Sequence, residues 1–268
     1  MWTFTQDVDE YAEAAEAFLT ADPISNTVPL TVLVGMKAGI RVEGAYFGWW
    51  RPDGQVRGAV FRTPPHPLGL ARMPVEAIPA LVEALRDREV PEVVGPVELT
   101  DAFTAASGGQ VVRVVSERLY ALGTLEIPSV PGHGRLATAA DLPLLVAWCQ
   151  AFHQEVELNP GDVVAYVERR LAGREFFVWE DDGAPVSLAA LQPPAGGVCR
   201  IGPVYTPPSC RRRGYGAAVT AFASRTGVEE RCEQVVLFTD LANPTSNSVY
   251  QSIGYEPLTD YAHVMYRP

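Results

Sequence analysis

The chain has 268 residues, a formal net charge of −11 at pH 7, and 47% hydrophobic and 20% charged residues. This apolar content argues against disorder, the acidic balance argues against a nucleic-acid-binding protein, and the apolar runs are too short to span a bilayer. The length fits two domains of ordinary size.

The N-terminal segment MWTFTQDVDEYAEAAEAF is acidic and amphipathic, and it lacks the basic-then-apolar order of a signal peptide. We therefore expect a cytoplasmic protein that needs no membrane. Arginine is common but Lys37 is the only lysine, a bias typical of GC-rich coding sequences such as many bacterial ones. Because the cysteines have no CxxC or CxH spacing, we expect neither a metal site nor a disulfide framework. They are Cys149, Cys199, Cys210 and Cys232.

The first half contains a segment whose order returns in the second half. GAVFRTPPHPLGLARMPVEAIPALVEAL predicts a strand, a Thr-Pro-Pro turn at 63–65, a short loop and an alanine-rich helix. GPVYTPPSCRRRGYGAAVTAFASRT has the same order around the Thr-Pro-Pro at 206–208, which indicates two copies of one fold. IPSVPGHGR, residues 127–135, has the composition of a linker. We therefore predict domains at 1–130 and 131–268, and we expect the aromatic run at 46–50 to fill the first core rather than line a pocket.

The second half predicts alternating helices and strands. Residues 135–138 predict a strand, and Asp141 is expected to cap a helix over 142–155 that is broken at Asn159-Pro160-Gly161. A second helix is predicted over 162–172. Three strands then form a meander, over 175–180, 186–191 and 198–206. The remaining elements are a helix over about 215–225, a buried strand over 234–240, a helix over 244–253, and strands over 255–258 and 263–267. The pattern predicts an α/β (α+β) fold with a mixed sheet.

Three consecutive arginines lie between the last strand of the meander and the helix that follows. The first turn of a helix leaves backbone N–H groups without internal partners, and the helix dipole favours an anion there. Gly214 and Gly216 lack a Cβ, so a phosphate can approach the backbone closely, and arginine can add bidentate bonds. The loop therefore predicts a pyrophosphate site, although a solvated arginine loop whose glycines serve the turn is the alternative. It is neither a Walker loop nor a dinucleotide fingerprint.

A second motif follows in FTDLANPTSNSVYQSIGYEPL, residues 238–258. Arg211-x-x-Gly214-x-Gly216, together with Asn243 and then Tyr250 seven residues later, resembles the GCN5-related N-acetyltransferase (GNAT) superfamily. The Gly254-Tyr255 pair and the opening GRLATAADLPLL are also similar to that family. The resemblance covers about residues 134–268 and implies the GNAT fold there. The first half lacks both motifs, so the resemblance implies a degenerate GNAT-like copy that completes the fold.

The resemblance implies an acetyltransferase that moves an acetyl group from acetyl-CoA to a primary amine of a small acceptor by direct attack. It implies that Tyr250 protonates the leaving thiolate, a role that suits a phenol because it is protonated at neutral pH. Many family members carry a glutamate base on the strand before the phosphate loop, but this strand has none. Glu155, Asp240 or water are therefore candidates, and both carboxylates are equally explained as solvated or capping groups. A homodimer is compatible with the sequence.

The resemblance also implies which residues bind acetyl-CoA. These are Val204, Thr206, Arg211, Arg212, Arg213, Gly214, Tyr215, Gly216, Ala217, Asn243 and Ser246. Two other classes of function stay open at this point. One is a CoA-binding regulatory or scaffold protein without transferase activity. The other is a nucleotide- or phosphate-binding module that uses the same loop, against which the absence of a Mg²⁺-ligand pattern counts.

Overall fold

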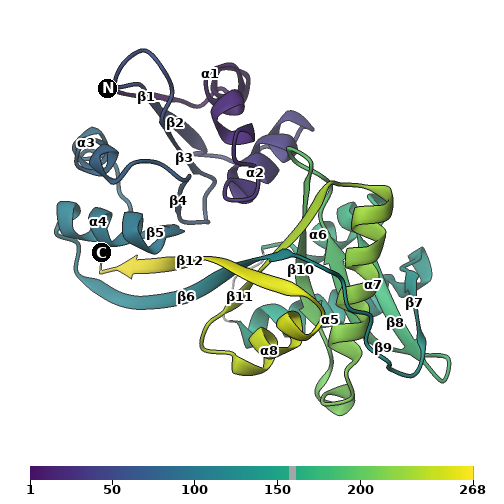
Figure 1. Cartoon of the computed structure of the whole chain (residues 1–268). Helices are drawn as coiled ribbons and strands as arrows, with labels where there is room; N and C mark the ends of the chain where they lie inside the picture. The colour runs from purple at the N-terminus through teal and green to yellow at the C-terminus, as the bar shows by residue number, and fades with distance from the viewer. Residues whose placement is uncertain (157–160, 268) are drawn as a thin grey trace. The chain divides into compact units, whose positions relative to one another are not determined.

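The computed structural model describes residues 1–156 and 161–267. The chain forms two compact units, whose elements are labelled in Figure 1. Unit 1 comprises Met1–Leu119, Thr239–Ala242 and Leu258–Pro268, and unit 2 comprises Tyr120–Phe238 and Asn243–Pro257. Among the described residues, no helix combines the length and the apolar character needed to cross a membrane.

Unit 1 is built on a mixed sheet with the strand order β1-β2-β3-β4-β5-β12. Strands β4 and β5 are parallel, with Gly69 opposite Val94, whereas β1–β2, β2–β3, β3–β4 and β5–β12 are antiparallel. Its elements in chain order are β1 (Trp2–Thr5), α1 (Val8–Thr20), α2 (Thr27–Lys37), β2 (Tyr46–Trp50), β3 (Gly58–Arg62), β4 (Leu68–Leu70), the 3-10 turn η1 (Val75–Ala77), α3 (Ile78–Ala84), β5 (Glu92–Pro96), α4 (Val97–Ser107), and parts of β6 (Val111–Leu122) and β12 (Tyr255–Tyr266).

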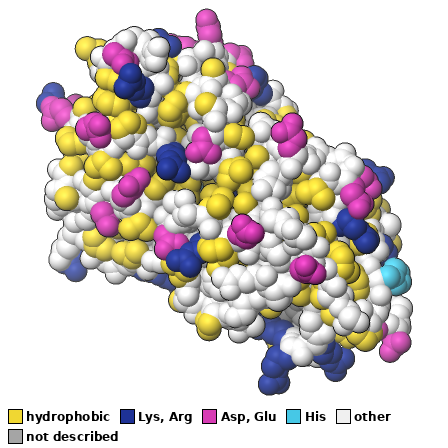
Figure 2. All heavy atoms as spheres, in the orientation of Figure 1, with side chains coloured by type: hydrophobic (Ala, Val, Ile, Leu, Met, Phe, Trp, Pro, Cys, Tyr) yellow, Lys and Arg dark blue, Asp and Glu magenta, His cyan; other side chains and the backbone are white. Residues whose placement is uncertain are grey.

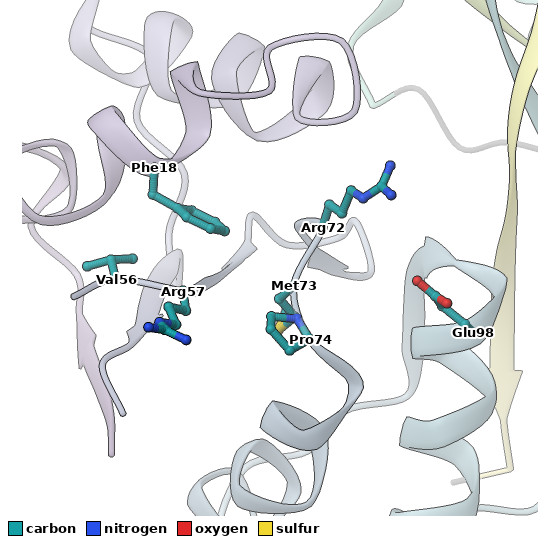
Figure 3. Close-up of a pocket in the computed structure, with 7 residues that line it drawn as sticks. All are labelled: Phe18, Val56, Arg57, Arg72, Met73, Pro74 and Glu98. Atoms are coloured by element: carbon teal, nitrogen blue, oxygen red, sulfur yellow. The ribbon is translucent and has the colours of Figure 1, made fainter. Parts of the chain in front are cut away.

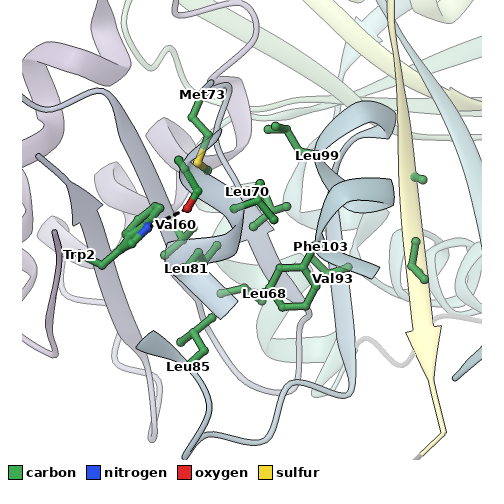
Figure 4. Packing of buried hydrophobic residues seen from close by; sticks show 14 of the residues in the cluster. Trp2, Val60, Leu68, Leu70, Met73, Leu81, Leu85, Val93, Leu99 and Phe103 are labelled. Atoms are coloured by element: carbon green, nitrogen blue, oxygen red, sulfur yellow. Dashed lines mark hydrogen bonds between the residues drawn. The ribbon is translucent and has the colours of Figure 1, made fainter. Parts of the chain in front are cut away.

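The core of unit 1 gathers apolar side chains from its strands and from α3 and α4 (Figure 4). The Trp2 indole is buried there and donates a hydrogen bond to the carbonyl of Ala77 at 3.1 Å, which ties β1 to η1. Tyr46, Phe47 and Trp49 of β2 are also buried. The expectation that the aromatic run fills a core is therefore confirmed.

The strands of unit 2 follow the order β11-β10-β9-β8-β7 and are also mixed in direction. Strands β10 and β11 are parallel, and the neighbouring pairs on the other side are antiparallel. Helix α7 packs on β8, β9 and β10, so its alanine-rich face is buried. The elements are β7 (His133–Leu136), η2 (Ala139–Asp141), α5 (Leu142–Glu155), α6 (Val163–Ala172), β8 (Phe176–Asp181), β9 (Ala184–Leu191), β10 (Val198–Tyr205), η3 (Pro208–Cys210), α7 (Tyr215–Glu230), β11 (Gln234–Asp240) and α8 (Pro244–Ser252).

The α/β fold class is confirmed, but several local expectations are corrected. The predicted linker ends early, because β7 already begins at His133. Helix α7 continues to Glu230, beyond the predicted end. Residues 255–266 form one strand rather than two, since Pro257 lies near its start and does not interrupt it. The predicted break at Asn159-Pro160 lies outside the described residues.

Asp141 occupies the N-cap position of α5 as expected, but its side chain makes no cap hydrogen bond to that helix. Thr138 begins a 3-10 turn before the helix, and Asp141 closes a capping box by accepting the Thr138 N–H at 2.7 Å. The same carboxylate accepts two hydrogen bonds from Arg135 of β7, both at 2.8 Å. This pairing with Arg135 holds the pKa of Asp141 down to about 2. Asp141 therefore fastens β7 to the start of α5.

Both halves of the chain follow one element order, strand, two helices, three strands, helix, strand, helix and strand. The Thr-Pro-Pro echo is nevertheless one strand out of register. Thr63–Pro65 follows β3, whose counterpart is β9, whereas Thr206–Pro208 follows β10, whose counterpart is β4. The sequence interpretation placed β4 in a loop because Leu68-Gly69-Leu70 is too short to show alternation.

Candidate cofactor-binding site

The site in unit 2 begins where β10 continues beyond the residues that pair with β11. The parallel register runs from Val198 opposite Gln234 to Ile201 opposite Leu237, and β10 then continues to Tyr205. The pairing of β10 with β9 shifts between Ile201 and Val204. Beyond Ile201, backbone groups of β10 can pair with an amide-rich ligand as an added strand would. Val204, a predicted cofactor contact, lies in this stretch.

The loop after β10 opens directly into α7. Arg212 (φ +63°) and Gly214 (φ +82°) have left-handed backbone conformations, and the helix begins at Tyr215. The amide of Ala218 donates to the Gly214 carbonyl at 3.0 Å, so the amides of residues 215–217 precede the first internal bond of the helix. A Cβ built on Gly216 would have only the Thr206 hydroxyl within 4 Å, at 3.4 Å. These amides and the open space beside Gly216 suit a phosphate.

The arginines of this loop are exposed. In Figure 1 the loop lies at the lower end of α7, and Figure 2 shows Lys and Arg side chains gathered at the lower edge of the same view. The Arg211 guanidinium is held in place, because it donates to both carboxylate oxygens of Glu155, at 2.6 and 2.8 Å, and to the Thr206 carbonyl at 2.8 Å. Glu155 at the end of α5 thus already has a cationic partner.

The Tyr215 side chain points into the protein rather than toward an anion. It is buried, and its hydroxyl donates a hydrogen bond to the carboxylate of Asp181 at the end of β8. That hydrogen bond raises the pKa of the Tyr215 phenol. Tyr215 therefore anchors the start of α7, and its contribution to anion binding is its backbone N–H.

The second motif forms the start of α8. Asn243 is the N-cap, and its side-chain oxygen accepts the Ser246 N–H at 3.0 Å. Asn247 donates to the Asn243 carbonyl at 2.8 Å and accepts from the buried Tyr120 hydroxyl at 2.8 Å. The side-chain oxygen and the carbonyl of Asn243 thus help to build the helix start, and a cofactor contact through that side-chain oxygen would have to share it.

Tyr250 lies on α8 with its ring against the core of unit 2, edge-to-face with Tyr255 at 6.2 Å between ring centroids. Burial raises the pKa of its phenol to about 12. Among the described residues, no group accepts or donates a hydrogen bond at this hydroxyl. Tyr250 is therefore a protonated donor at neutral pH whose hydroxyl is free for a ligand.

Neither carboxylate predicted as a base is free. Glu155 is ion-paired with Arg211. Asp240 accepts the Ala242 N–H at 2.7 Å, and it belongs to unit 1 rather than to the unit that carries the arginine loop. Across residues 1–156 and 161–267 no group of three or more His, Cys, Asp or Glu could hold a metal ion.

Sequence reasoning missed a buried arginine that contacts β10 where its register with β9 shifts. Arg170 of α6 is 4% exposed; it donates to Glu175 at 2.5 Å and to the Gly202 carbonyl at 2.9 Å, and it also contacts the Tyr166 hydroxyl. It thereby fixes the stretch where β10 leaves its register. A signal was present, because Val163, Val167 and Arg170 share one buried helix face at the i, i+4, i+7 spacing.

Solved structures similar over the whole length of the chain share this fold. They include a GNAT-family acetyltransferase from Colwellia psychrerythraea (10% identity, all of both chains, TM-score 0.65). A GCN5-related N-acetyltransferase from Sphaerobacter thermophilus has 17% identity, 100% and 96% coverage, and a TM-score of 0.64. A tandem GNAT protein from the clavulanic acid biosynthesis pathway has 12% identity, 100% and 99% coverage, and a TM-score of 0.60. At these identities the likeness concerns the fold alone.

The acetyltransferase (GNAT) family model matches residues 143–255, a segment that contains the arginine loop, α7 and α8. This match over residues 143–255 supports membership of the GNAT superfamily. Both units together have a fold consistent with a tandem GNAT protein. No curated protein sequence matches the chain significantly.

Proposed function

We propose that the chain is an acyl-CoA-dependent N-acyltransferase that moves an acetyl group from acetyl-CoA to a primary amine of a small acceptor. The observation that carries this proposal is the start of α7. Gly214 supplies the left-handed turn into α7, and Gly216 leaves space beside its first amides, within the segment that matches the GNAT family.

The residues present fit the diphosphate of coenzyme A. The backbone amides of Tyr215, Gly216 and Ala217 would hold it, with charge from Arg212 and Arg213. The backbone of β10 at Val204 and Thr206 would pair with the amides of the pantetheine arm. Ser187 fixes that end of the strand, because its hydroxyl donates to the Tyr205 carbonyl at 3.0 Å and bonds the Thr206 hydroxyl at 2.8 Å.

Acetyl-CoA supplies the activated acyl group, which the amine attacks directly. Tyr250 gives its proton to the departing thiolate. Burial raises the pKa of its phenol and so keeps it protonated for this role. The engagement of Glu155 with Arg211 disfavours Glu155 as the base, and Asp240 is occupied by the Ala242 amide. We therefore assign removal of the amine proton to water rather than to a carboxylate of this chain.

We further propose that residues 131–268 form the catalytic domain and that residues 1–130 form a degenerate copy. The loop after β4 supports this division. It contains no glycine between Ala71 and Ala77, and Pro74 offers no N–H. This loop therefore does not provide the group of free backbone N–H donors that a diphosphate needs.

The test is calorimetric titration of acetyl-CoA, CoA and ATP into the wild type and two variants. Gly216→Asp places a carboxylate beside the amides, so we expect CoA affinity to fall about 50-fold or more. Val228→Asp adds the same charge at an exposed position of the same helix and should leave affinity within twofold. Equal binding by both variants, or a preference for ATP, would overturn the site.

A second assay follows acetyl transfer to a panel of primary amines, detected as free CoA thiol. Transfer that is lost in Gly216→Asp and retained in Val228→Asp supports the transferase. Tight CoA binding without transfer to any amine would reject it in favour of a CoA-binding regulatory protein.

A further inference from the structure

Unit 1 has its own pair of parallel strands, β4 and β5, in the place that β10 and β11 take in unit 2. In open α/β sheets, ligands bind outside the carboxyl ends of the strands. In unit 1 that end carries the loop 71–74 after β4 and the start of α4 after β5. A ligand of this unit is therefore expected between these two segments.

Two cavities of unit 1 lie there. One has a volume of roughly 480 Å³ and is lined by Phe18, Val56, Arg57, Arg72, Met73, Pro74 and Glu98 (Figure 3). The other, roughly 350 Å³, is lined by Ser25, Arg72, Pro96, Val97, Glu98, Thr259, Asp260 and Tyr261. Both volumes fall in the range of small-molecule sites. The two cavities share Arg72 and Glu98, so these residues stand at the centre of the region.

Arg72 and Glu98 are the two charged residues that line both cavities. Both side chains are exposed, and neither has an ion-pair partner among the residues that the structure describes. The other charged residues of the lining do have partners. Arg57 is paired with Asp53, and Asp260 accepts two hydrogen bonds from Arg118, at 2.5 and 2.8 Å.

The backbone that carries these two charges is fixed. The Arg72 N–H donates to the side-chain oxygen of Asn26 at 3.2 Å, and Asn26 is 1% exposed and donates in turn to the Leu19 carbonyl. Glu98 lies in the first turn of α4, where the helix dipole stabilises a carboxylate. The backbone positions of one cationic and one anionic residue are thus fixed independently of each other.

The apolar part of the lining is on the larger cavity. Figure 3 shows the Phe18 ring directed from α1 toward the segment that carries Arg72 and Met73, and the Glu98 carboxylate directed toward the same segment. Val56, Met73 and Pro74 complete this apolar surface. A ligand that satisfies both charges therefore also meets an apolar wall.

We propose that unit 1 binds a zwitterionic α-amino acid with an apolar side chain. Its carboxylate pairs with Arg72, its ammonium pairs with Glu98, and its side chain enters the larger cavity against Phe18 and Met73. A diphosphate does not fit, since the loop lacks glycine and α3 has prolines in and before its start. This site is separate from the acetyl-CoA site of unit 2 and does not rest on the proposed transferase activity.

The test titrates leucine, N-acetylleucine and leucinamide into the full-length protein by calorimetry. N-acetylleucine lacks the cation and leucinamide lacks the carboxylate, so each should bind about tenfold or more weakly than leucine, because one charge-assisted pair is lost. Glycine should also bind more weakly, since it has no side chain for the apolar wall. Equal binding of leucine and N-acetylleucine, or no binding of leucine at millimolar concentration, would overturn the proposal.

Two variants test the residues themselves. Arg72→Gln should weaken leucine about tenfold or more, and Glu98→Gln should do so while removing the preference over N-acetylleucine. The matched controls are Arg86→Gln, another exposed arginine of unit 1, and Glu10→Gln, another first-turn glutamate, and both should stay within twofold of wild type. Controls that weaken leucine as much as the test variants would contradict the assignment. Displacement of leucine by CoA would overturn the assignment of an amino-acid site and indicate an acyl-CoA site instead.

Gly216→Asp separates this proposal from the one made for unit 2. It should lower CoA affinity about 50-fold or more and leave leucine binding unchanged. Leucine binding that disappears together with CoA binding would place the amino acid in unit 2 and overturn the unit 1 site.

Discussion

Helices α8 and α4 follow the corresponding strands β11 and β5, yet we propose a catalytic role for a residue of α8 alone. Asn243 caps α8 through its side chain, and Tyr250 lies seven residues further on. Pro96 stands at the same point of α4 without a side-chain cap, and seven residues on lies Phe103. Phe103 contacts Tyr266 at 6.4 Å between ring centroids, much as Tyr250 contacts Tyr255 at 6.2 Å. The packing is shared, and the hydroxyl is what distinguishes the helix with a proposed catalytic role.

The helices that precede these strands differ in the same way. Gly216 leaves space beside the first amides of α7, and Gly214 supplies the left-handed turn that starts the helix. The corresponding start of α3 contains Pro79, preceded by Pro74 at the edge of η1. Proline removes an N–H where glycine exposes one. The two units teach that this fold accepts proline or glycine at the helix start, whereas the phosphate site that we propose requires glycine there.

The largest expected effect comes from converting the Tyr250 position into its unit 1 counterpart. Tyr250→Phe removes the proton donor but keeps the ring, so kcat should fall about 100- to 1000-fold while CoA affinity stays within twofold. Steady-state kinetics and calorimetry measure the two quantities. Tyr266→Phe removes a hydroxyl in unit 1 and should leave kcat unchanged. An unaltered kcat in Tyr250→Phe would remove Tyr250 from the mechanism.

The second effect concerns the aspartates at the starts of α5 and α1. Asp141→Asn breaks the pairing with Arg135, so the local stability of α5 should fall by about 2 kcal/mol. Asp7→Asn keeps a good N-cap on α1 and should change stability by less than about 0.5 kcal/mol. Hydrogen exchange of the two helices measures both, and about 2 kcal/mol corresponds to roughly 30-fold faster exchange in α5.

The pH dependence of α5 has a defined sign. The pKa of Asp141 is lowered to about 2 in the folded chain, below the value near 3.9 of an unfolded aspartate. Its stabilisation is therefore complete above about pH 4 and is lost as the pH falls toward 2. Asp141→Asn should lack this part of the acid dependence, and an identical acid profile for variant and wild type would contradict the assignment.

The smallest effect is expected at Glu155. Glu155→Gln frees Arg211 from its exposed ion pair, so CoA affinity should rise by a factor of about two to five with kcat unchanged. Glu229→Gln, an exposed glutamate near the end of α7, is the matched control. A hundredfold loss of kcat with unchanged affinity would instead make Glu155 the base.

The sequence was most informative where function depends on local chain geometry. The arginine loop, the glycines of α7 and the Asn-to-Tyr spacing of α8 are contiguous signals, and they located the candidate site. Asp141 was misjudged because its partner, Arg135, lies on a separate element and no local pattern indicates the pair. Strand β4 was missed since three residues show no periodicity. Arg170 was overlooked because a buried arginine is rare, although its helix position marked it as inward-facing.

Long-range strand pairing was beyond sequence reasoning for the same reason. Nothing in HVMYR indicates that it pairs with EVVGP, more than 150 residues earlier, yet His263 lies opposite Val94 and Val264 opposite Val93. The repeat predicted that both halves share a fold. It did not predict that the last strand of the chain belongs to the first unit.

That assignment has a consequence for synthesis on the ribosome. A nascent chain usually folds its N-terminal domain first, but the first unit here lacks the strand that pairs with β5 until residues 261–265 have been made. Until then the edge of β5 presents unpaired backbone groups of the kind that recruit other chains. Unit 1 can therefore complete its strand pairing only after residues 261–265 have been synthesised. A chain released from a ribosome that stalls near codon 250 would expose the edge of β5 and would be a substrate for chaperones.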